Sequence, residues 1–241
     1  MNPMRFHELI EADHDIQNPL SPQKLARIVD YLRILSTDRV LDVGSGKGSM
    51  LAAFVERQPR EIIGLDLSPV FAEAARQRLA GQASVHIVEG PALDFAVEPA
   101  TFDVAVCIGA TFALGGLEGT LDWLARAVKS GGRIAVGEPF ALRPFTPEVS
   151  ARWAEYDRTL ADIGDLIAGR GLTLTGIVAS SIDDWDHYES QHWRAAAAWA
   201  RANPDDPDAA WLTEKMAADR AHYLAEERDA FGWAVFIAEK P

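Results

Sequence analysis

The sequence is poor in cysteine and has no long apolar segment. Cys107 is the only cysteine among 241 residues, so no disulfide can form within the chain, and a reducing compartment such as the cytoplasm is expected. No apolar run approaches the roughly 20 residues of a membrane-spanning helix. The first fifteen residues carry several carboxylates and no apolar core segment, which does not fit a secretory signal.

Basic residues are also scarce. The chain holds 23 Lys and Arg against 36 Asp and Glu, a net charge of −13. Nucleic-acid binding draws much of its affinity from Lys and Arg on phosphates, so neither a nucleic acid nor an anionic membrane surface is an expected partner. A small neutral or cationic substrate fits this charge better. The length and the 48% hydrophobic content allow one large domain, or one domain with a small lid, as a monomer or homodimer.

The first 38 residues are predicted to be helical. Ser21 is a favourable N-cap and Pro22 a favourable first helical residue. Apolar residues then recur at helical spacing, at Leu25, Ile28, Val29 and Leu32. Two roles are open for residues 1–38. They pack against the main sheet, or they form a cap over a ligand site with residues 14–24 near the ligand.

From residue 39 onward, apolar strands alternate with helical patterns. Seven strands are predicted, at Arg39–Val43, Glu61–Leu67, Val85–Glu89, Phe102–Ile108, Arg133–Gly137, Thr173–Ala179 and Trp233–Ala238. Helices are predicted between them, at Ser49–Gln58, Pro69–Ala80, Gly116–Lys129 and residues 150–169. Such alternation predicts an α/β fold with a doubly wound, mostly parallel sheet covered on both faces.

About 50 residues separate the last two predicted strands, which is too many for an ordinary loop. They are predicted to form two helices, around residues 187–202 and 208–229, with Asp206 capping the second helix at Pro207. We interpret this insertion as a helical lid. The predicted organisation is therefore a cap, a core and a lid: residues 1–38, residues 39–181 plus 231–241, and residues 182–230.

The stretch Val40–Gly48 is the strongest motif in the chain. A buried strand ends in Gly44, Gly46 and Gly48, and a helical pattern follows at once. Glycines there let backbone N–H groups approach a ligand, and the positive end of the following helix points to the same place. The spacing does not match a P-loop, and the third glycine comes one residue too early for a dinucleotide-binding turn.

Two carboxylates accompany this loop. Asp42 lies two residues before the first glycine, where it would repel a pyrophosphate and suit a ligand that carries an ammonium group. Asp66 ends the second strand, about twenty residues beyond the first glycine, the distance at which an acidic side chain meets ribose hydroxyls. Leu67 would then offer an apolar surface to a purine ring.

These motifs resemble those of the class I S-adenosylmethionine-dependent methyltransferases, from about residue 39 to residue 140. The resemblance implies a Rossmann-like methyltransferase fold, with S-adenosylmethionine as cofactor and S-adenosylhomocysteine as product. It implies that Asp42 lies beside the methionine part of the cofactor and that Asp66 holds its ribose. The loop residues implied to wrap the cofactor are Gly44, Ser45 and Gly46.

The resemblance extends to the ends of the third and fourth strands. The segment after the third strand is implied to contact the adenine, but here Pro91, followed by Ala92, replaces the usual acidic residue. Asp94 or a backbone group is then the alternative contact. Ile108 and Gly109, at the end of the fourth strand, are implied to line the cofactor pocket.

The ends of the fourth and fifth strands are expected to face the methyl group, because open α/β sheets bind ligands outside the carboxyl ends of their strands. Glu138 is a candidate general base or a site for a cationic substrate, or it pairs with a nearby Arg such as Arg143. Thr111 contacts the substrate, or it caps the next helix or bonds to the backbone.

The start of the predicted lid is rich in aromatic and imidazole groups. Trp185, Tyr188 and Trp193 are candidate substrate contacts, because aromatic faces attract cations, or they form a small core of the lid itself. His187 and His192 are candidate general bases. Their five-residue spacing puts them on different helix faces, so no metal site is expected.

We therefore expect transfer of a methyl group from S-adenosylmethionine to O, N or S of a small molecule. Two other functions stay open. The first is a regulatory protein that binds S-adenosylmethionine without turnover. The second, disfavoured by the glycine spacing, is an NAD(P)-dependent oxidoreductase. Thermal stabilisation by S-adenosylhomocysteine or by NAD(P)H would distinguish the cofactors.

Overall fold

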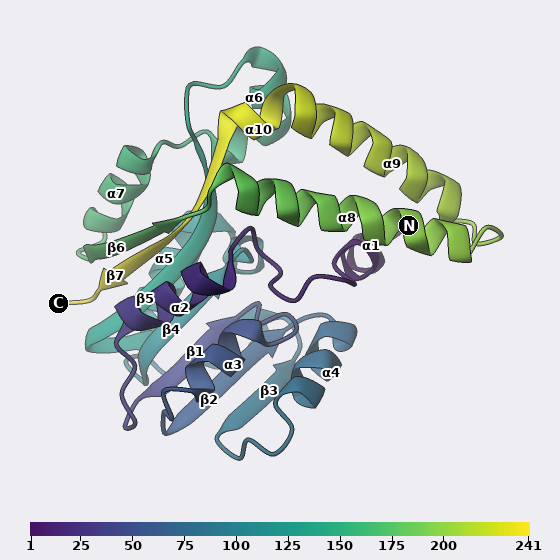
Figure 1. The fold of residues 1–241 in the computed structure, drawn as a ribbon. Coiled ribbons are helices and arrows are strands. Elements are labelled where there is room, and N and C mark those ends of the chain that lie inside the picture. Colours follow the sequence, from purple (N-terminus) through teal and green to yellow (C-terminus); the bar gives the residue numbers. More distant parts are fainter.

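The computed structural model describes all 241 residues and contains one seven-stranded sheet. The strand order is β3-β2-β1-β4-β5-β7-β6, and only β7 runs antiparallel to its neighbours (Figure 1). The strands are β1 (Arg39–Val43), β2 (Glu61–Asp66), β3 (Val85–Glu89), β4 (Phe102–Ile108), β5 (Val128–Ala141), β6 (Thr173–Ala179) and β7 (Phe231–Glu239). The predicted mostly parallel, seven-stranded fold is confirmed.

Helices cover both faces of the sheet. Side chains alternate along β1, so that Leu41 and Val43 join one apolar core and Val40 joins the other. Two helices pack on each core: α5 (Gly116–Ala127) and α7 (Leu160–Ala168) on the first, α2 (Pro22–Leu32) and α3 (Ser49–Val55) on the second. Helix α4 (Pro69–Arg78) packs beside β2 and β3. Because both faces are buried, a ligand can reach the sheet only at the strand ends.

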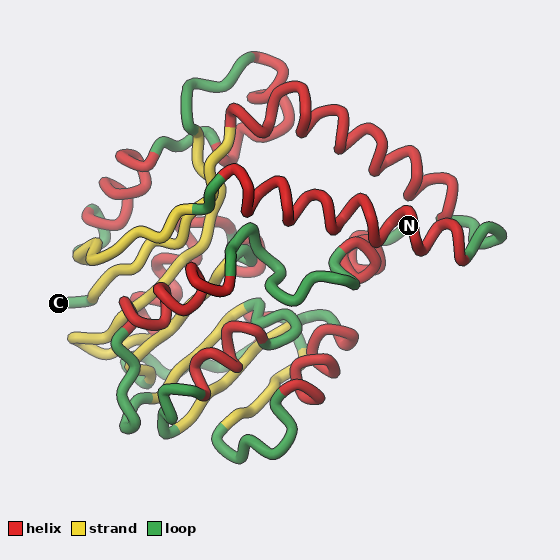
Figure 2. The backbone as a smooth tube through the Cα atoms, viewed as in Figure 1, coloured by secondary structure: helices red, strands yellow, loops and turns green.

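The N-terminal segment packs against two different parts of the molecule. Helix α2 packs its apolar face on the sheet, and Ser21 caps it as predicted, accepting from the Lys24 N–H at 3.3 Å. Helix α1 (Pro3–Ile10) instead packs on the insertion before the last strand, through Ile10. Residues 11–21 form the loop between α1 and α2, which runs between the strands and that insertion (Figure 2).

The insertion before the last strand is helical, as predicted. It consists of α8 (Ile182–Ala202), α9 (Ala209–His222), a π-helical turn (Tyr223–Glu227) and α10 (Arg228–Ala230). Helix α8 begins at Ile182 because Ser181 and Asp184 form a capping box. The predicted cap at Asp206 is wrong. Helix α9 begins after Asp208, and the Asp206 carboxylate instead accepts from the Arg5 guanidinium at 2.7 Å.

The single helix predicted over residues 150–169 is also wrong. Two helices are present, α6 (Pro147–Trp153) and α7, with a 3₁₀ turn at Ala154–Tyr156 between them. The break follows from Thr159, which starts α7 through a capping box with Asp162. None of the helices in the chain is long and apolar enough to cross a membrane.

Candidate functional site

A cavity of about 690 Å³ lies at the carboxyl ends of β1, β2 and β4. Helix α1 and the loop after it form the opposite wall, together with Tyr188 of α8. This volume is within the range of about 300 to 1,000 Å³ for small-molecule sites. All ten residues predicted to bind a cofactor line the cavity: Asp42, Gly44, Ser45, Gly46, Asp66, Leu67, Pro91, Ala92, Ile108 and Gly109.

The glycine turn lies directly against the loop after α1. Gly46 has a φ of 53°, and a Cβ there would overlap the amide oxygen of Gln17. That oxygen accepts from the backbone N–H of Lys47 at 2.6 Å. Gly109, at the end of β4, has a φ of 78° and lies equally close to the side chain of Asn18. Both glycines are therefore required by backbone conformation and by close approach of the cap.

Asp42 forms an acidic and unpaired part of the cavity wall. Its side chain is 2% exposed and has no hydrogen bond or ion pair. Burial, followed by the negative charge of Asp66, raises the pKa of the Asp42 carboxyl to about 8. The hydroxyl of Ser45 is also buried without a partner. A ligand with an ammonium group would compensate the carboxylate, so these residues fit the amino-acid end of S-adenosylmethionine.

Asp66 is positioned by the glycine turn itself. Its carboxylate accepts from the backbone N–H of Gly46 at 2.7 Å and of Ser68 at 2.9 Å. Burial raises the pKa of Asp66, although these hydrogen bonds oppose the shift. A carboxylate has about four acceptor sites, so capacity remains for ribose hydroxyls. Leu67 and Pro91 on the same wall are apolar, which fits an adenine ring.

Thr111 and Glu138 lie together, but outside this cavity. The Thr111 hydroxyl donates to a Glu138 carboxylate oxygen at 2.9 Å, and both side chains are buried. Burial raises the pKa of Glu138 to about 7. The pair lines a second cavity of about 580 Å³, and Phe112 lines both cavities. No ion pair joins Glu138 to Arg143, so that alternative is wrong.

The aromatic and imidazole groups of α8 separate into two sets. Tyr188 lines the cavity, and His192 lies behind it, bonded to Glu11. Trp193 instead packs between α1 and α9, and Trp185 packs against the apolar core beside α2. His187 is exposed and contacts Gln191, one turn further along the helix. Periodicity could not separate these residues, because the lid also buries a face against α1 and α9.

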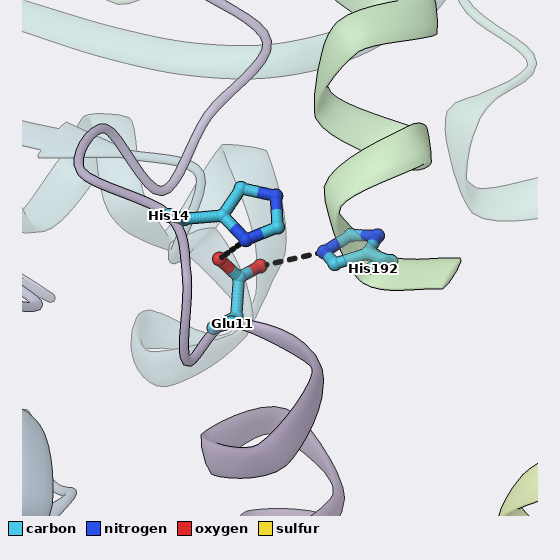
Figure 3. Close-up of side chains that lie close together, drawn as sticks. All are labelled: Glu11, His14 and His192. Carbon is cyan, nitrogen blue, oxygen red and sulfur yellow. Dashed lines mark hydrogen bonds and ion pairs between the residues drawn. The ribbon is translucent and has the colours of Figure 1, made fainter. Parts of the chain in front are cut away.

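One cluster joins residues that the sequence pattern did not connect. Glu11 and His14, near the end of α1, meet His192 of α8 (Figure 3). A Glu11 oxygen lies 2.9 Å from His192 Nε2, and its other oxygen lies 3.4 Å from His14 Nδ1. Burial acts to lower the pKa of His192, but hydrogen bonds to Glu11 and Glu189 outweigh it and raise the pKa to about 9. No local motif could reveal a contact across about 180 residues.

Comparison with known proteins identifies the family. A family model described as a methyltransferase domain matches residues 40–132. The uncharacterised protein YjhP of Escherichia coli K12 is 31% identical over 240 residues, which is 96% of each chain. A crystal structure of an S-adenosylmethionine-dependent methyltransferase from Geobacter sulfurreducens with S-adenosylhomocysteine is 30% identical, with a TM-score of 0.90 over 98% of each chain.

A second such structure, from Thiobacillus denitrificans and also in complex with S-adenosylhomocysteine, is 32% identical. Its TM-score is 0.90 over the whole of both chains. Because both matches span nearly the full length, they include the N-terminal segment and the insertion before the last strand as well as the sheet. The chain therefore belongs to the class I S-adenosylmethionine-dependent methyltransferases and is an enzyme that transfers methyl groups from that cofactor.

Proposed function

We propose that the methyl acceptor is a small neutral or cationic molecule and that it binds in the same 690 Å³ cavity as the cofactor. The observation that carries this proposal is the charge of the wall. Glu11, Asp42 and Asp66 line the cavity, and no Lys or Arg does. An anionic acceptor would lose its hydration there without gaining a counter-charge, so it would bind poorly.

The lining divides into two halves. The residues at the strand ends, from Asp42 to Gly109, form the proposed cofactor half. The other half comes from the N-terminal segment and α8. It mixes apolar and aromatic side chains with polar ones: Pro3, Met4, Ile16, Leu20, Leu25 and Tyr188 with His7, Glu11, Gln17 and Asn18. We assign the acceptor to this half. Its mixed apolar and acidic character suits an organic molecule that carries an amine, hydroxyl or thiol group.

The chemistry then needs little from the protein beyond alignment. The cofactor supplies an electrophilic methyl group on a sulfonium. The cap and Tyr188 hold the acceptor heteroatom in line with that methyl and exclude water, and such alignment can supply much of the rate enhancement. Glu138 stays a predicted general base. Its raised pKa suits that role, but an acceptor would have to reach past Phe112, which lines both cavities.

The proposal is tested with matched acceptors. Purified enzyme is incubated with S-adenosylmethionine and pairs of small molecules that differ only in charge, such as an amine and its carboxylate counterpart. Release of S-adenosylhomocysteine is followed, and the product is identified by mass spectrometry. We expect turnover of neutral or cationic members. Turnover restricted to phosphates or carboxylates would overturn the proposed acceptor class while leaving methyl transfer itself intact.

Two further expectations concern the location of the protein and its oligomeric state. A cytoplasmic location and a monomeric or homodimeric state stay predictions from the sequence. Cell fractionation and sedimentation analysis test them.

A further inference from the structure

The cluster of Glu11, His14 and His192 has an unusual pattern of hydrogen bonds. His14 Nε2 lies 3.0 Å from the backbone carbonyl oxygen of Tyr188. A carbonyl oxygen can only accept, so Nε2 carries the hydrogen, and in the neutral ring Nδ1 keeps a lone pair. That Nδ1 faces a Glu11 carboxylate oxygen at 3.4 Å. Both atoms are buried, and neither has a hydrogen-bond partner.

Two acceptor atoms that face each other in a buried site are stabilised by a cation that contacts both of them. No Lys or Arg side chain fills this role. The nearest ammonium, that of Lys47, donates to the backbone carbonyl of Glu11 at 2.7 Å rather than to its carboxylate. Glu11 is 6% exposed, His14 2% and His192 8%, so bulk solvent does not compensate them either.

The third side chain completes a ligand set. His192 Nδ1 lies 3.6 Å from a Glu189 carboxylate oxygen, which leaves Nε2 directed at Glu11. One ligand atom from each of the three residues lies within 4.8 Å of the others. Two imidazoles and one carboxylate form the donor set of three-ligand sites for divalent transition metals, which keep one coordination position open.

The surroundings match those of metal-binding histidines. Such histidines usually donate their second ring N–H to a carbonyl or a carboxylate, which fixes the ring. Here the Tyr188 carbonyl takes this role for His14 at 3.0 Å, and the Glu189 carboxylate lies 3.6 Å from Nδ1 of His192, as an ion-pair contact. The Tyr188 hydroxyl also donates to Glu11 at 2.7 Å. His14 and Glu11 therefore have orienting hydrogen bonds, and His192 has a nearby carboxylate.

We propose that Glu11, His14 and His192 bind one divalent transition-metal ion, with Zn²⁺ as the preferred probe. Ligands about 2.1 Å from a tetrahedral Zn²⁺ lie roughly 3.4 Å apart. Glu11 Oε2 and His14 Nδ1 already have this separation, at 3.4 Å. The 2.9 Å contact of His192 Nε2 is to the other oxygen, Oε1, so the carboxylate or the His192 ring has to turn when the metal binds. The five-residue spacing of His187 and His192 predicts no metal site formed by these two residues. The site proposed here is a different one, because the partners of His192 are Glu11 and His14 of the N-terminal segment.

The metal would join the cap to the lid at the wall of the cavity. Glu11 and His14 belong to the segment after α1, His192 belongs to α8, and Glu11 also lines the cavity (Figure 3). A fourth coordination position is left for water or for a heteroatom of the acceptor. This inference goes beyond the proposed acceptor class and does not depend on it.

The test is a metal titration of the full-length protein. Metal is removed with EDTA, and Zn²⁺ is then titrated in competition with a coloured chelator. Co²⁺ is added separately to read the coordination number from its visible absorption. We expect one Zn²⁺ per chain and a four-coordinate Co²⁺ spectrum. Failure to bind stoichiometric Zn²⁺ would overturn the proposal and leave Glu11 and His192 as an ion pair.

Four variants assign the site. His14→Gln and His192→Gln should each weaken Zn²⁺ binding by more than about 10-fold, and Tyr188→Phe by about 10-fold, as expected for a lost orienting hydrogen bond. His187→Gln is the matched control, because His187 lies on the same helix but is exposed and outside the cluster. It should leave Zn²⁺ affinity unchanged. An equal loss in His187→Gln, or no loss in the other three, would contradict the assignment.

Folding is checked independently of the metal. Calorimetric titration with S-adenosylhomocysteine reports whether each variant keeps the fold. If His14→Gln or His192→Gln fails this check, the Tyr188→Phe variant and the Co²⁺ spectrum of the unmodified chain decide the outcome. Binding of S-adenosylhomocysteine without any metal site would leave the methyl-transfer assignment standing and reject only the metal.

Discussion

The two walls of the cavity are built in different ways. The strand-end wall comes from short motifs in which the interacting residues are close in sequence, such as Gly46 and Asp66, joined by a 2.7 Å hydrogen bond across 20 positions. The opposite wall comes from segments at the two ends of the chain, such as Glu11 and His192, joined across 181 positions. The first wall fits a cofactor common to a whole family. The second is where individual enzymes can differ in substrate.

The largest expected effect tests the strand-end wall. Asp66→Ala removes the acceptor of the backbone N–H groups of Gly46 and Ser68 and of the proposed ribose hydroxyls. We expect the affinity for S-adenosylhomocysteine to fall by about 10- to 100-fold, since hydrogen bonds to a charged group contribute roughly 1.5 to 3 kcal/mol. Calorimetry measures it. Glu138→Ala is the control and should retain full affinity, because Glu138 lies in the second cavity.

A second substitution tests how closely the two walls meet. Gly46→Ala should lower the free energy of unfolding by about 1 to 2 kcal/mol, because its positive φ disfavours a side chain. It should also displace Gln17, whose amide oxygen occupies the space of the new methyl group. The double variant with Gln17→Ala relieves only the contact, so part of the loss should remain. Complete recovery of stability in chemical denaturation would show that backbone strain is negligible.

The unpaired carboxyl of Asp42 predicts a pH effect. Its pKa is about 8 in the folded chain, against 3.8 for an ordinary aspartate, so between these values the folded state holds a proton that the unfolded state has released. The contribution of Asp42 to the stability of the ligand-free protein should therefore fall as the pH rises from about 4 to 8. In thermal melts across this pH range, Asp42→Asn should lack this loss of stability, because the asparagine side chain does not titrate. An identical pH dependence in both proteins would refute the unpaired carboxyl.

The features that could be predicted from the sequence depend on residues close together in the chain. The helix cap at Ser21, an N-cap residue followed by proline, is confirmed. The cap at Asp206 was predicted by the same rule and is wrong, because the helix begins two residues later, at Ala209. The Asp206 carboxylate accepts from the Asp208 N–H and from Arg5, about 200 positions away. The spacing of the glycines and the position of Asp66 were enough to predict which residues at the strand ends line the cavity.

The cap and lid wall could not be derived in the same way. One of the two roles left open for the N-terminal segment put residues 14–24 near the ligand. Gln17 does reach the glycine turn and Asn18 reaches Gly109, but neither was identified as an individual contact. Substrate contact and packing within the insertion were both open for the aromatic residues of α8, and Trp193 packs beside α9. Only tertiary packing decides which of these side chains faces the cavity.

The division of the cavity into a cofactor wall and an acceptor wall is tested most directly by one calorimetric comparison. S-adenosylhomocysteine is titrated into the wild-type protein, Asp66→Ala and Tyr188→Phe, and methyl transfer to an active acceptor is measured on the same preparations. Tyr188→Phe removes only a hydroxyl from the acceptor wall, so it should keep wild-type affinity for S-adenosylhomocysteine and lose turnover. Asp66→Ala should lose affinity. An affinity reduced in Tyr188→Phe as much as in Asp66→Ala would contradict the division.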